Sequence, residues 1–246
     1  MTDISIRKHI RWLPDEASEP TSTIVLTSPE RRFVDLRILL DQKPSPDGTL
    51  PLSALEWAIA GTSSSKIIQH SEDGDISHSQ WKHWIDSRTP NTDNVADEGD
   101  MYPQPDGSTL EKGHMVNPAT GLDTEYEEVW VSEEIQAVPA FTSGGELADV
   151  RVCVVLEMRR DEEGRRGMVV RLGQYCQGFA RTGGGEGDVA VERWRWEGEE
   201  GWVRGVRIGE GEMPCDFAMH LAAEAVKGDV VSVGGDVWMV VEREGV

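Results

Sequence analysis

The sequence predicts an all-β protein made of two β-rich halves, and three observations support this prediction. Apolar and polar residues alternate with a period of two along much of the 246-residue chain, whereas helical periodicity is almost absent. Gly, Pro, Asp and Ser separate the short β-branched runs, as they do at turns between antiparallel strands. Small residues at positions 142–145 divide the pattern in two. Short antiparallel strands at close spacing are typical of barrels and sandwiches.

The first half opens with two predicted strands and a clear hairpin. Residues 4–12 place isoleucines on even positions, residues 22–28 form a β-branched run, and residues 33–40 form the next, with a turn at 29–32. The last run places four apolar side chains on one face: Val34, Leu36, Ile38 and Leu40. This alternation predicts a strand with one buried face.

Two further strands are predicted before residue 87, and an irregular segment at residues 79–86 follows them. Residues 55–60 fit a buried strand and residues 66–70 a second one. Trp81 and Trp84 lie three positions apart, and one face of a regular strand cannot hold both, because successive side chains alternate. The spacing predicts a bulge or a short helical turn at this point.

A long acidic segment follows. Residues 87–123 show little hydrophobic periodicity and contain several Pro and Gly residues, so they predict a long loop. Residues 91–134 hold twelve acids and one base, Lys112, which gives a net charge of 1 − 12 = −11. A strand pattern returns at residues 126–135.

The second half repeats the strand pattern and interrupts it with one helix. Strand-like runs occupy residues 150–158, 168–180, 189–196 and 202–208. Residues 214–227 predict the helix, with Asp216 as its N-cap and Gly228 after its end. A hairpin at residues 229–242 follows, and its double Gly at 234–235 suits a two-residue turn.

The charge of the chain excludes two classes of partner. Lys and Arg number 24 and Asp and Glu number 45, so the formal net charge is 24 − 45 = −21. Nucleic acids and anionic membrane surfaces are bound through clustered basic side chains, so neither partner is expected. No apolar run approaches the ~20 residues that span a bilayer, so no membrane insertion is expected. Three Cys without a CxxC pair favour a reducing, intracellular compartment.

Short segments spread along nearly the whole chain carry a resemblance to a known protein family. In the first half the matching residues are 19–23 (EPTST), 25–29 (VLTSP), 32–37 (RFVDLR), 56–62 (EWAIAGT), 84–87 (WIDS), 97–103 (DEGDMYP) and 127–130 (EEVW). In the second half they are 167–178 (GMVVRLGQYCQG), 228–231 (GDVV) and 238–242 (WMVVE). In their order and spacing these segments resemble the fungal Hri protein family.

This resemblance implies a fold of two tandem lipocalin-like antiparallel β-barrel domains. We therefore expect an N-terminal barrel domain at residues 1–143, carrying the acidic loop at 87–123, and a C-terminal barrel domain at residues 144–246, carrying the short helix. The resemblance also implies a location in cytoplasm and nucleus. It implies association with a casein kinase 1 and with a subunit of the endoplasmic-reticulum Sec translocon. No enzymatic activity or cofactor is established for the family.

The candidate metal ligands and phosphate-binding loops all favour a structural interpretation. His78, His83 and Asp86 form the one local His cluster, but nothing in their spacing fixes a coordination geometry. The acids Asp93, Asp97, Glu98 and Asp100 lack the order of a calcium-binding loop. The Gly-rich residues 183–187 lack the Lys-Ser/Thr of a phosphate-binding loop. We expect no metal and no cofactor.

No catalytic residue is assigned either. Cys153, Cys176 and Cys215 lie in apolar or strand contexts, where buried structural thiols are the default. No nucleophile motif accompanies them. The sequence is therefore interpreted as that of a non-enzymatic protein.

Four residues are candidates for ligand binding: Glu56, Trp57, Trp130 and Gln177. A small β-barrel is either filled by side chains or holds one small ligand, and its tryptophans fit both cases. Glu56 and Gln177 are polar groups in apolar surroundings, so each can face solvent, make a core hydrogen bond or orient a ligand.

Three hypotheses about function follow. The first is a protein-interaction module, since the acidic segment would complement a basic surface on a partner such as casein kinase 1. The second is a carrier of a small hydrophobic ligand. The third, and weakest, is an isomerase or cyclase of fungal small-molecule metabolism, with Glu56 as acid or base. Homodimer formation is left open.

Overall fold

The computed structural model describes residues 2–70, 74–141, 147–185, 187–220 and 224–246. Its first half contains β1 (Asp3–Trp12), β2 (Thr21–Thr27), β3 (Arg32–Leu39), the single-turn helix η1 (Leu52–Ala54), β4 (Leu55–Gln69), β5 (Ile76–Asp86), β6 (Ala96–Pro103), β7 (Thr109–Val116) and β8 (Asp123–Glu133). Its second half contains β9 (Val138–Phe141), β10 (Leu147–Val150), β11 (Val152–Arg160), η2 (Asp161–Glu163), β12 (Arg165–Leu172), β13 (Tyr175–Arg181), β14 (Val189–Trp196), η3 (Gly198–Glu200), β15 (Trp202–Ile208), α1 (Cys215–His220), β16 (Val230–Val233) and β17 (Asp236–Gly245). The all-β class is confirmed.

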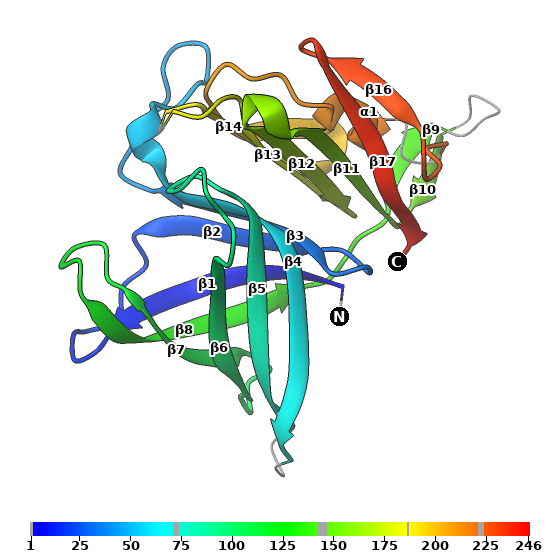
Figure 1. The fold of residues 1–246 in the computed structure, drawn as a ribbon. Helices are drawn as coiled ribbons and strands as arrows, with labels where there is room; N and C mark the ends of the chain where they lie inside the picture. The colour runs from blue at the N-terminus through cyan, green and yellow to red at the C-terminus, as the bar shows by residue number, and fades with distance from the viewer. Residues whose placement is uncertain (1, 71–73, 142–146, 186, 221–223) are drawn as a thin grey trace.

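The first half closes into an eight-stranded antiparallel barrel. Strands β1 to β8 pair in sequence order, and β8 returns to pair with β1, so that Trp12 lies opposite Tyr126 (Figure 1). The hairpin expected at residues 22–40 is present as β2 and β3. The barrel predicted from the family resemblance is therefore confirmed for this half.

Strand β3 shows how the barrel wall is built. Val34, Leu36 and Ile38 point outward and join a core that includes residues of the second half. The alternate residues Phe33, Asp35 and Arg37 line the barrel interior. Both faces of β3 are therefore covered. Leu40, expected on the apolar face, follows the end of the strand and is 62% exposed.

Strands β4 and β5 form a long hairpin that joins segments expected to be separate. Residues 55–60 and 66–70 belong mostly to one strand, β4. The predicted bulge is present, because the register with β5 shifts between Ala60 and Gly61. A Cβ on Gly61 would lie 1.9 Å from the carbonyl oxygen of Lys82, so this close approach of the two backbones requires glycine.

The expected loop at residues 87–123 is wrong for much of its length. Strands β6 and β7 occupy this segment and complete the barrel. Their inward residues include Asp97, Glu111 and two glycines, and their outward residues face solvent. Neither face is continuously apolar, so the strands show no hydrophobic alternation.

The second half is a seven-stranded antiparallel sheet in the order β15-β14-β13-β12-β11-β17-β16. A second closed barrel was expected, but among the described residues the edge strands β15 and β16 do not pair with each other. The barrel wall covers one face of the sheet, and α1 packs on the other (Figure 1). Both apolar faces are thus buried without closure of the sheet.

The helix is shorter than predicted, and the final hairpin is as predicted. Helix α1 covers six residues, whereas residues 214–227 were expected, of which 221–223 lie outside the described part of the chain. Strands β16 and β17 form the hairpin, with positive φ at Gly234 and Gly235. Strand β17 also pairs with β11 inside the sheet, so this hairpin is integral to it.

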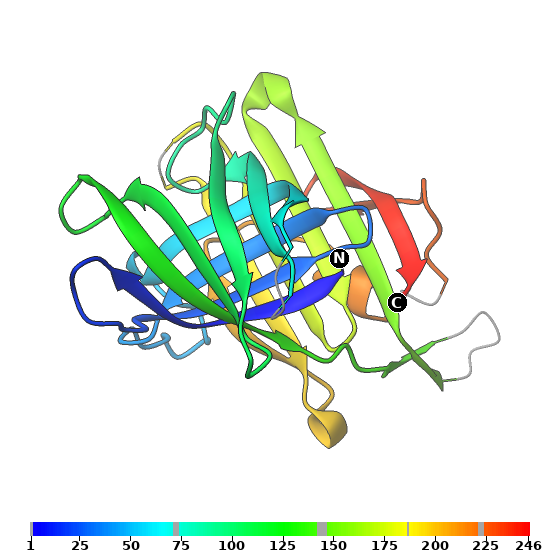
Figure 2. The same ribbon diagram turned by 90° about the horizontal axis from the view of Figure 1, so that it is seen from below.

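One apolar core joins the two halves. It contains Leu26, Leu36 and Ala58 from the barrel and Val155, Phe179 and Val191 from the sheet, among others. Strands β12 and β13 of the sheet pack against β2 to β5 of the barrel. Figure 2, a view from below, shows the sheet behind the barrel. The boundary expected at residues 143 and 144 falls between β9 and β10, which pair with each other, and inside the segment that the structure leaves undescribed. That boundary stays a prediction.

Candidate functional site

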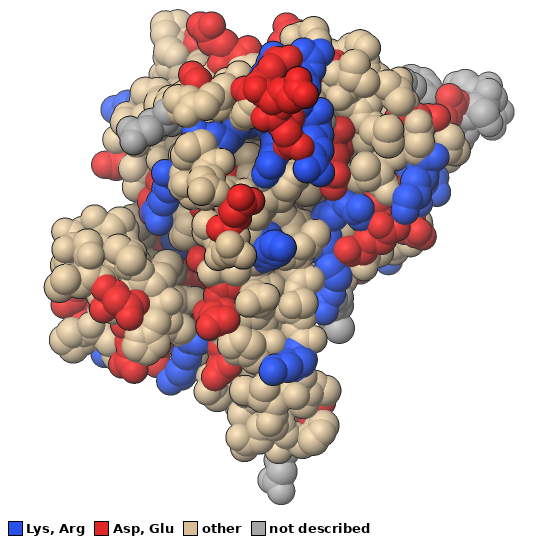
Figure 3. Space-filling view, viewed as in Figure 1, with Lys and Arg blue, Asp and Glu red and all other residues tan. Residues whose placement is uncertain are grey.

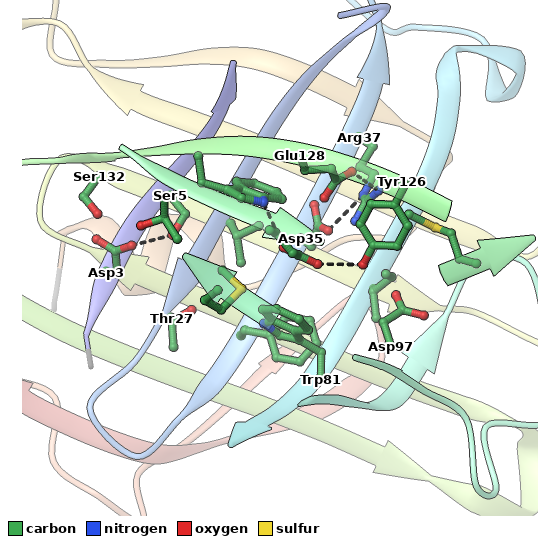
Figure 4. A pocket seen from close by; sticks show the side chains of 18 residues that line it. Asp3, Ser5, Thr27, Asp35, Arg37, Trp81, Asp97, Tyr126, Glu128 and Ser132 are labelled. Carbon is green, nitrogen blue, oxygen red and sulfur yellow. Dashed lines mark hydrogen bonds and ion pairs between the residues drawn. The ribbon is translucent and has the colours of Figure 1, made fainter. Parts of the chain in front are cut away.

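The barrel encloses a cavity of about 130 Å³ to which all eight strands contribute side chains (Figure 4). The lining consists of Asp3, Ser5, Val25, Thr27, Phe33, Asp35, Arg37, Ile59, Trp81, Asp97, Met101, Thr109, Glu111, Met115, Tyr126, Glu128, Trp130 and Ser132. Polar and aromatic side chains are mixed in this wall. The interior is therefore neither a filled apolar core nor a purely apolar pocket.

A buried ion network forms part of the wall. Arg37 donates to Asp35 Oδ2 through Nε (3.0 Å) and to Glu128 Oε1 through Nη1 (3.3 Å). Arg7 also binds Glu128 and reaches Glu19 Oε2 at 2.9 Å. Burial alone would lower the pKa of Arg37, but the charges of Asp35 and Glu128 outweigh it and raise that pKa. Arg37 therefore stays charged.

Asp35 keeps one free acceptor at the cavity. Its side chain is 6% exposed, and Oδ2 accepts the hydrogen bond from Arg37. The second oxygen, Oδ1, has no hydrogen-bond partner among the described residues. Figure 4 shows Asp35 among the side chains around the cavity. A buried carboxylate oxygen without a partner costs roughly 1–3 kcal/mol or more, so Oδ1 is an unsatisfied acceptor in the wall of the cavity.

Glu111, another residue of the cavity wall, belongs to a second hydrogen-bonded group. The Tyr126 hydroxyl donates to Glu111 Oε1 (2.7 Å), and Trp130 Nε1 donates to Oε2 (2.9 Å). Burial, and secondarily the charge of Glu128, raises the pKa of Glu111 to about 8. At neutral pH this carboxyl is therefore mostly protonated.

Two glycines make room for this group. Gly99 and Gly113 lie opposite each other on β6 and β7. A Cβ on Gly99 would lie 2.9 Å from Glu111, and one on Gly113 would lie 2.6 Å from the Tyr126 hydroxyl oxygen. The absence of side chains at both positions thus admits the larger groups to the interior.

His83 links the cavity wall to a neighbouring aromatic cluster. Its Nδ1 lies 2.8 Å from Asp86 Oδ2, and its Nε2 lies 3.4 Å from Asp97 Oδ2. Burial lowers the pKa of His83, but its hydrogen bonds to Asp86 and Asp97 outweigh this and raise the pKa to about 9. Trp57 Nε1 donates to the other Asp86 oxygen at 2.9 Å. His83 is thus a cation held between two carboxylates.

The structure brings only some of the predicted ligand-binding residues together. Trp130 lines the cavity, and Trp57 belongs to the buried cluster that adjoins it. Glu56 pairs with Arg88 instead. Gln177 lies in the contact between the two halves, where it donates to the carbonyls of Ile24 and Val34.

Sequence reasoning missed the charged members of the wall, above all Asp35, Arg37, Glu111 and Glu128. Charged residues at alternate positions of β3, between Val34, Leu36 and Ile38, were the available signal.

Within the residues that the structure describes, no group of three or more His, Cys, Asp and Glu side chains could hold a metal ion. No described helix is long and apolar enough to cross a membrane.

A second cavity of about 230 Å³ lies in the other half, against β12, β13 and the β16–β17 turn. Arg165 and Asp236, two of its polar wall residues, pair with each other. Trp238 is its one aromatic wall residue, whereas Trp81, Trp130, Tyr126 and Phe33 line the barrel cavity. We therefore treat the barrel cavity as the candidate binding site.

Comparison with known proteins identifies a matching protein family and a similar crystal structure. The family model described as Protein HRI1 matches residues 3–242. The crystal structure of the uncharacterized protein YLR301w from Saccharomyces cerevisiae is similar, with a TM-score of 0.71 and 19% identity over 100% of both chains. At this identity the likeness concerns the fold alone. No curated protein matches the chain.

Proposed function

The chain belongs to the HRI1 family, and we propose that it is a non-enzymatic binding protein whose barrel cavity holds a small molecule. The observation that carries the proposal is the free Oδ1 of Asp35, a buried carboxylate oxygen beside a cavity. A barrel interior that served packing alone would be filled, or would pair this oxygen. A bound ligand with a hydrogen-bond donor supplies the missing partner.

Glu111 is the residue that most favours the enzyme alternative. A carboxyl whose pKa is raised to about 8 by burial and by Glu128 could act as a general acid near neutral pH. Both of its oxygens are already engaged, one by Tyr126 and one by Trp130. This engagement supports a structural role for Glu111, and with it the non-enzymatic proposal.

The test compares two variants on the same strand. Thr109 lines the cavity, and Lys112 points outward toward Glu127. Thr109→Phe should fill the cavity, while Lys112→Phe adds the same ring to the surface. Compounds that raise the melting temperature of the wild-type protein, or that remain bound in native mass spectrometry, should still bind Lys112→Phe and should not bind Thr109→Phe. Equal binding by both variants, or no binding by the wild type across a broad metabolite panel, would rule out the cavity.

We also propose, as a second function, a protein interaction through the acidic outer face of β6 to β8. Glu98 and Glu125 are well exposed there, and such a face favours a basic partner surface. The resemblance to a family named for binding a casein kinase 1 supports this kinase as the partner. It supports, more weakly, a Sec translocon subunit, and a location in cytoplasm and nucleus.

The structure narrows the residues that such an interaction can use. Glu111 and Glu128, counted in the acidic segment, are buried in the barrel and unavailable to a partner. Figure 3 shows acidic and basic side chains intermixed on the face it displays. A kinase pulldown should therefore weaken with Glu98→Gln and Glu125→Gln combined, and should not weaken with the matched pair Glu199→Gln and Glu200→Gln. Unchanged binding by the first pair would exclude this face.

A further inference from the structure

The charges that line the barrel cavity do not balance. Four carboxylates face it, those of Asp3, Asp35, Asp97 and Glu128, against one guanidinium, that of Arg37. Glu111 adds no charge at neutral pH, because burial raises its pKa to about 8. The formal charge of the wall is therefore 1 − 4 = −3.

The charged groups behind the wall cancel one another. Arg7 contacts Glu19 as well as the wall residue Glu128, and His83 contacts Asp86 as well as the wall residue Asp97. Together these four groups behind the wall add two positive and two negative charges, so the total stays at −3. Two of the wall carboxylates, those of Asp35 and Glu128, are buried and therefore poorly screened.

Aromatic side chains form much of the remaining wall. Phe33, Trp81, Tyr126 and Trp130 contribute to the lining, and Trp81 and Trp130 offer the largest rings. Figure 4 shows Trp81 and Tyr126 on the same side of the cavity as Asp97. The faces of such rings attract cations, and Trp does so most strongly.

We infer that the cavity selects a small organic cation, whose charged N–H or N-methyl head lies near Asp35 Oδ1 and between aromatic walls. This inference rests on the proposed ligand-binding function. It follows from three independent features: the free buried oxygen, the net negative wall and the aromatic lining. The negative charge of the wall would repel an anion. A purely apolar ligand would leave Asp35 Oδ1 desolvated and unpaired.

The experiment uses two pairs of probes that differ in charge and little in shape. Choline is compared with dimethylbutanol, in which carbon replaces the ammonium nitrogen, and butylamine is compared with butanol. Calorimetry on the full chain should show that at least one cation binds, and binds at least about tenfold more tightly than its neutral partner. Binding of the neutral partners as tight as that of the cations would overturn the inference, as would the failure of both cations to bind.

Two variants locate the interaction. Asp35→Asn should weaken binding of the cation about tenfold or more, while Asp41→Asn, an exposed change just after β3, should leave it unchanged. Asp35→Asn also removes a hydrogen-bond partner of Arg37 and can disturb folding. A second variant, Trp81→Leu, therefore tests the site independently. Trp81→Leu should weaken binding of the cation more than binding of the neutral compound. If both Asp35→Asn and Trp81→Leu fold and bind as the wild type does, the assignment is wrong.

Failure of this inference is distinguishable from failure of the proposed function. If neutral or anionic compounds bind and Thr109→Phe blocks them, the cavity binds ligands and only the preference for cations is wrong. If nothing binds the wild type, the ligand-binding function itself fails.

Discussion

Gly113 lies opposite Tyr126 across the β7–β8 pair, and a Cβ at Gly113 would approach the Tyr126 hydroxyl oxygen to 2.6 Å. Because Gly113 has no side chain, the Tyr126 ring can lie against its backbone and donate a hydrogen bond to Glu111 at 2.7 Å. The interior of the barrel therefore depends on the absence of one methyl group. A wall built so closely cannot accommodate an added side chain without displacing a ring.

Gly113→Ala should consequently destabilise the barrel. The methyl group must push Tyr126 away from Glu111, and overpacking of this kind costs about 1–3 kcal/mol. Chemical denaturation measures the loss. Gly205→Ala on β15 is the matched control, because a Cβ there meets nothing within 4 Å and the backbone is extended. Equal stability of the two variants would contradict the tight contact.

The stability of the protein should depend on pH through Glu111. Burial and the charge of Glu128 raise the pKa of Glu111 to about 8 in the folded state, from its ordinary value of 4.5. Between these pH values the unfolded chain releases a proton that the folded chain keeps, so stability falls as pH rises, by at most ~1.4 kcal/mol per pH unit. Glu111→Gln removes this group while keeping an amide that can bond to Tyr126 and Trp130.

The measurement is the unfolding free energy of both proteins at about pH 5 and about pH 8. The variant should lose less stability over this interval than the wild type. His83 has a folded pKa raised to about 9, because its hydrogen bonds to Asp86 and Asp97 outweigh burial, and its contribution is also lost as pH rises. It is present in both proteins and cancels in the difference. Parallel pH profiles would show that Glu111 titrates normally.

Glu242 should anchor the β2–β3 turn to the sheet. It is fully buried, and it accepts hydrogen bonds from Ser28 Oγ and from the Glu30 backbone N–H, both at 2.7 Å. Glu242→Leu leaves these two donors without their partner, at a cost of about 1–3 kcal/mol each. It also removes one of the three carboxylates that Arg32 contacts. Glu244→Leu, an exposed change on the same strand, should cost little. If chemical denaturation shows only a small loss of stability in both variants, Glu242 does not anchor the turn.

Much of the fold could be predicted because alternation survives wherever one face of a strand packs on a core. In this way β3 could be predicted from Val34, Leu36 and Ile38, and β11 from residues 150–158. The long loop was wrong because β6 and β7 have polar faces on both sides, one toward solvent and one toward a polar cavity. Hydrophobic periodicity carries no signal for such a strand.

The candidate site was predicted less well for a related reason. A charged residue that alternates with apolar ones can face solvent or line a cavity, and the sequence pattern is the same. Asp35 and Arg37 alternate with apolar neighbours, yet they are buried because the strand has closed into a barrel. Trp130 could be chosen as a large aromatic on a strand, whereas Glu56 and Gln177 required knowledge of their partners across the fold.

Gln177 gives the test of how the two halves depend on each other. It is fully buried on β13, donates to the carbonyls of Ile24 and Val34 at 3.0 Å, and accepts from Arg193 Nε at 2.6 Å. Arg193 in turn donates to Leu36 O at 2.7 Å. These bonds cross an apolar contact, where an unpaired polar group costs about 1–3 kcal/mol.

Gln177→Leu should therefore lower the stability of both halves together, because they share one core. Trp fluorescence, far-UV circular dichroism and near-UV circular dichroism should give one coincident transition, shifted to lower denaturant by the same amount. Gln80→Leu, an exposed change on β5, is the matched control and should leave the transition in place. If the variant instead separates the probes into two transitions, with the barrel unfolding at its original midpoint, then the contact through Gln177 does not couple the halves.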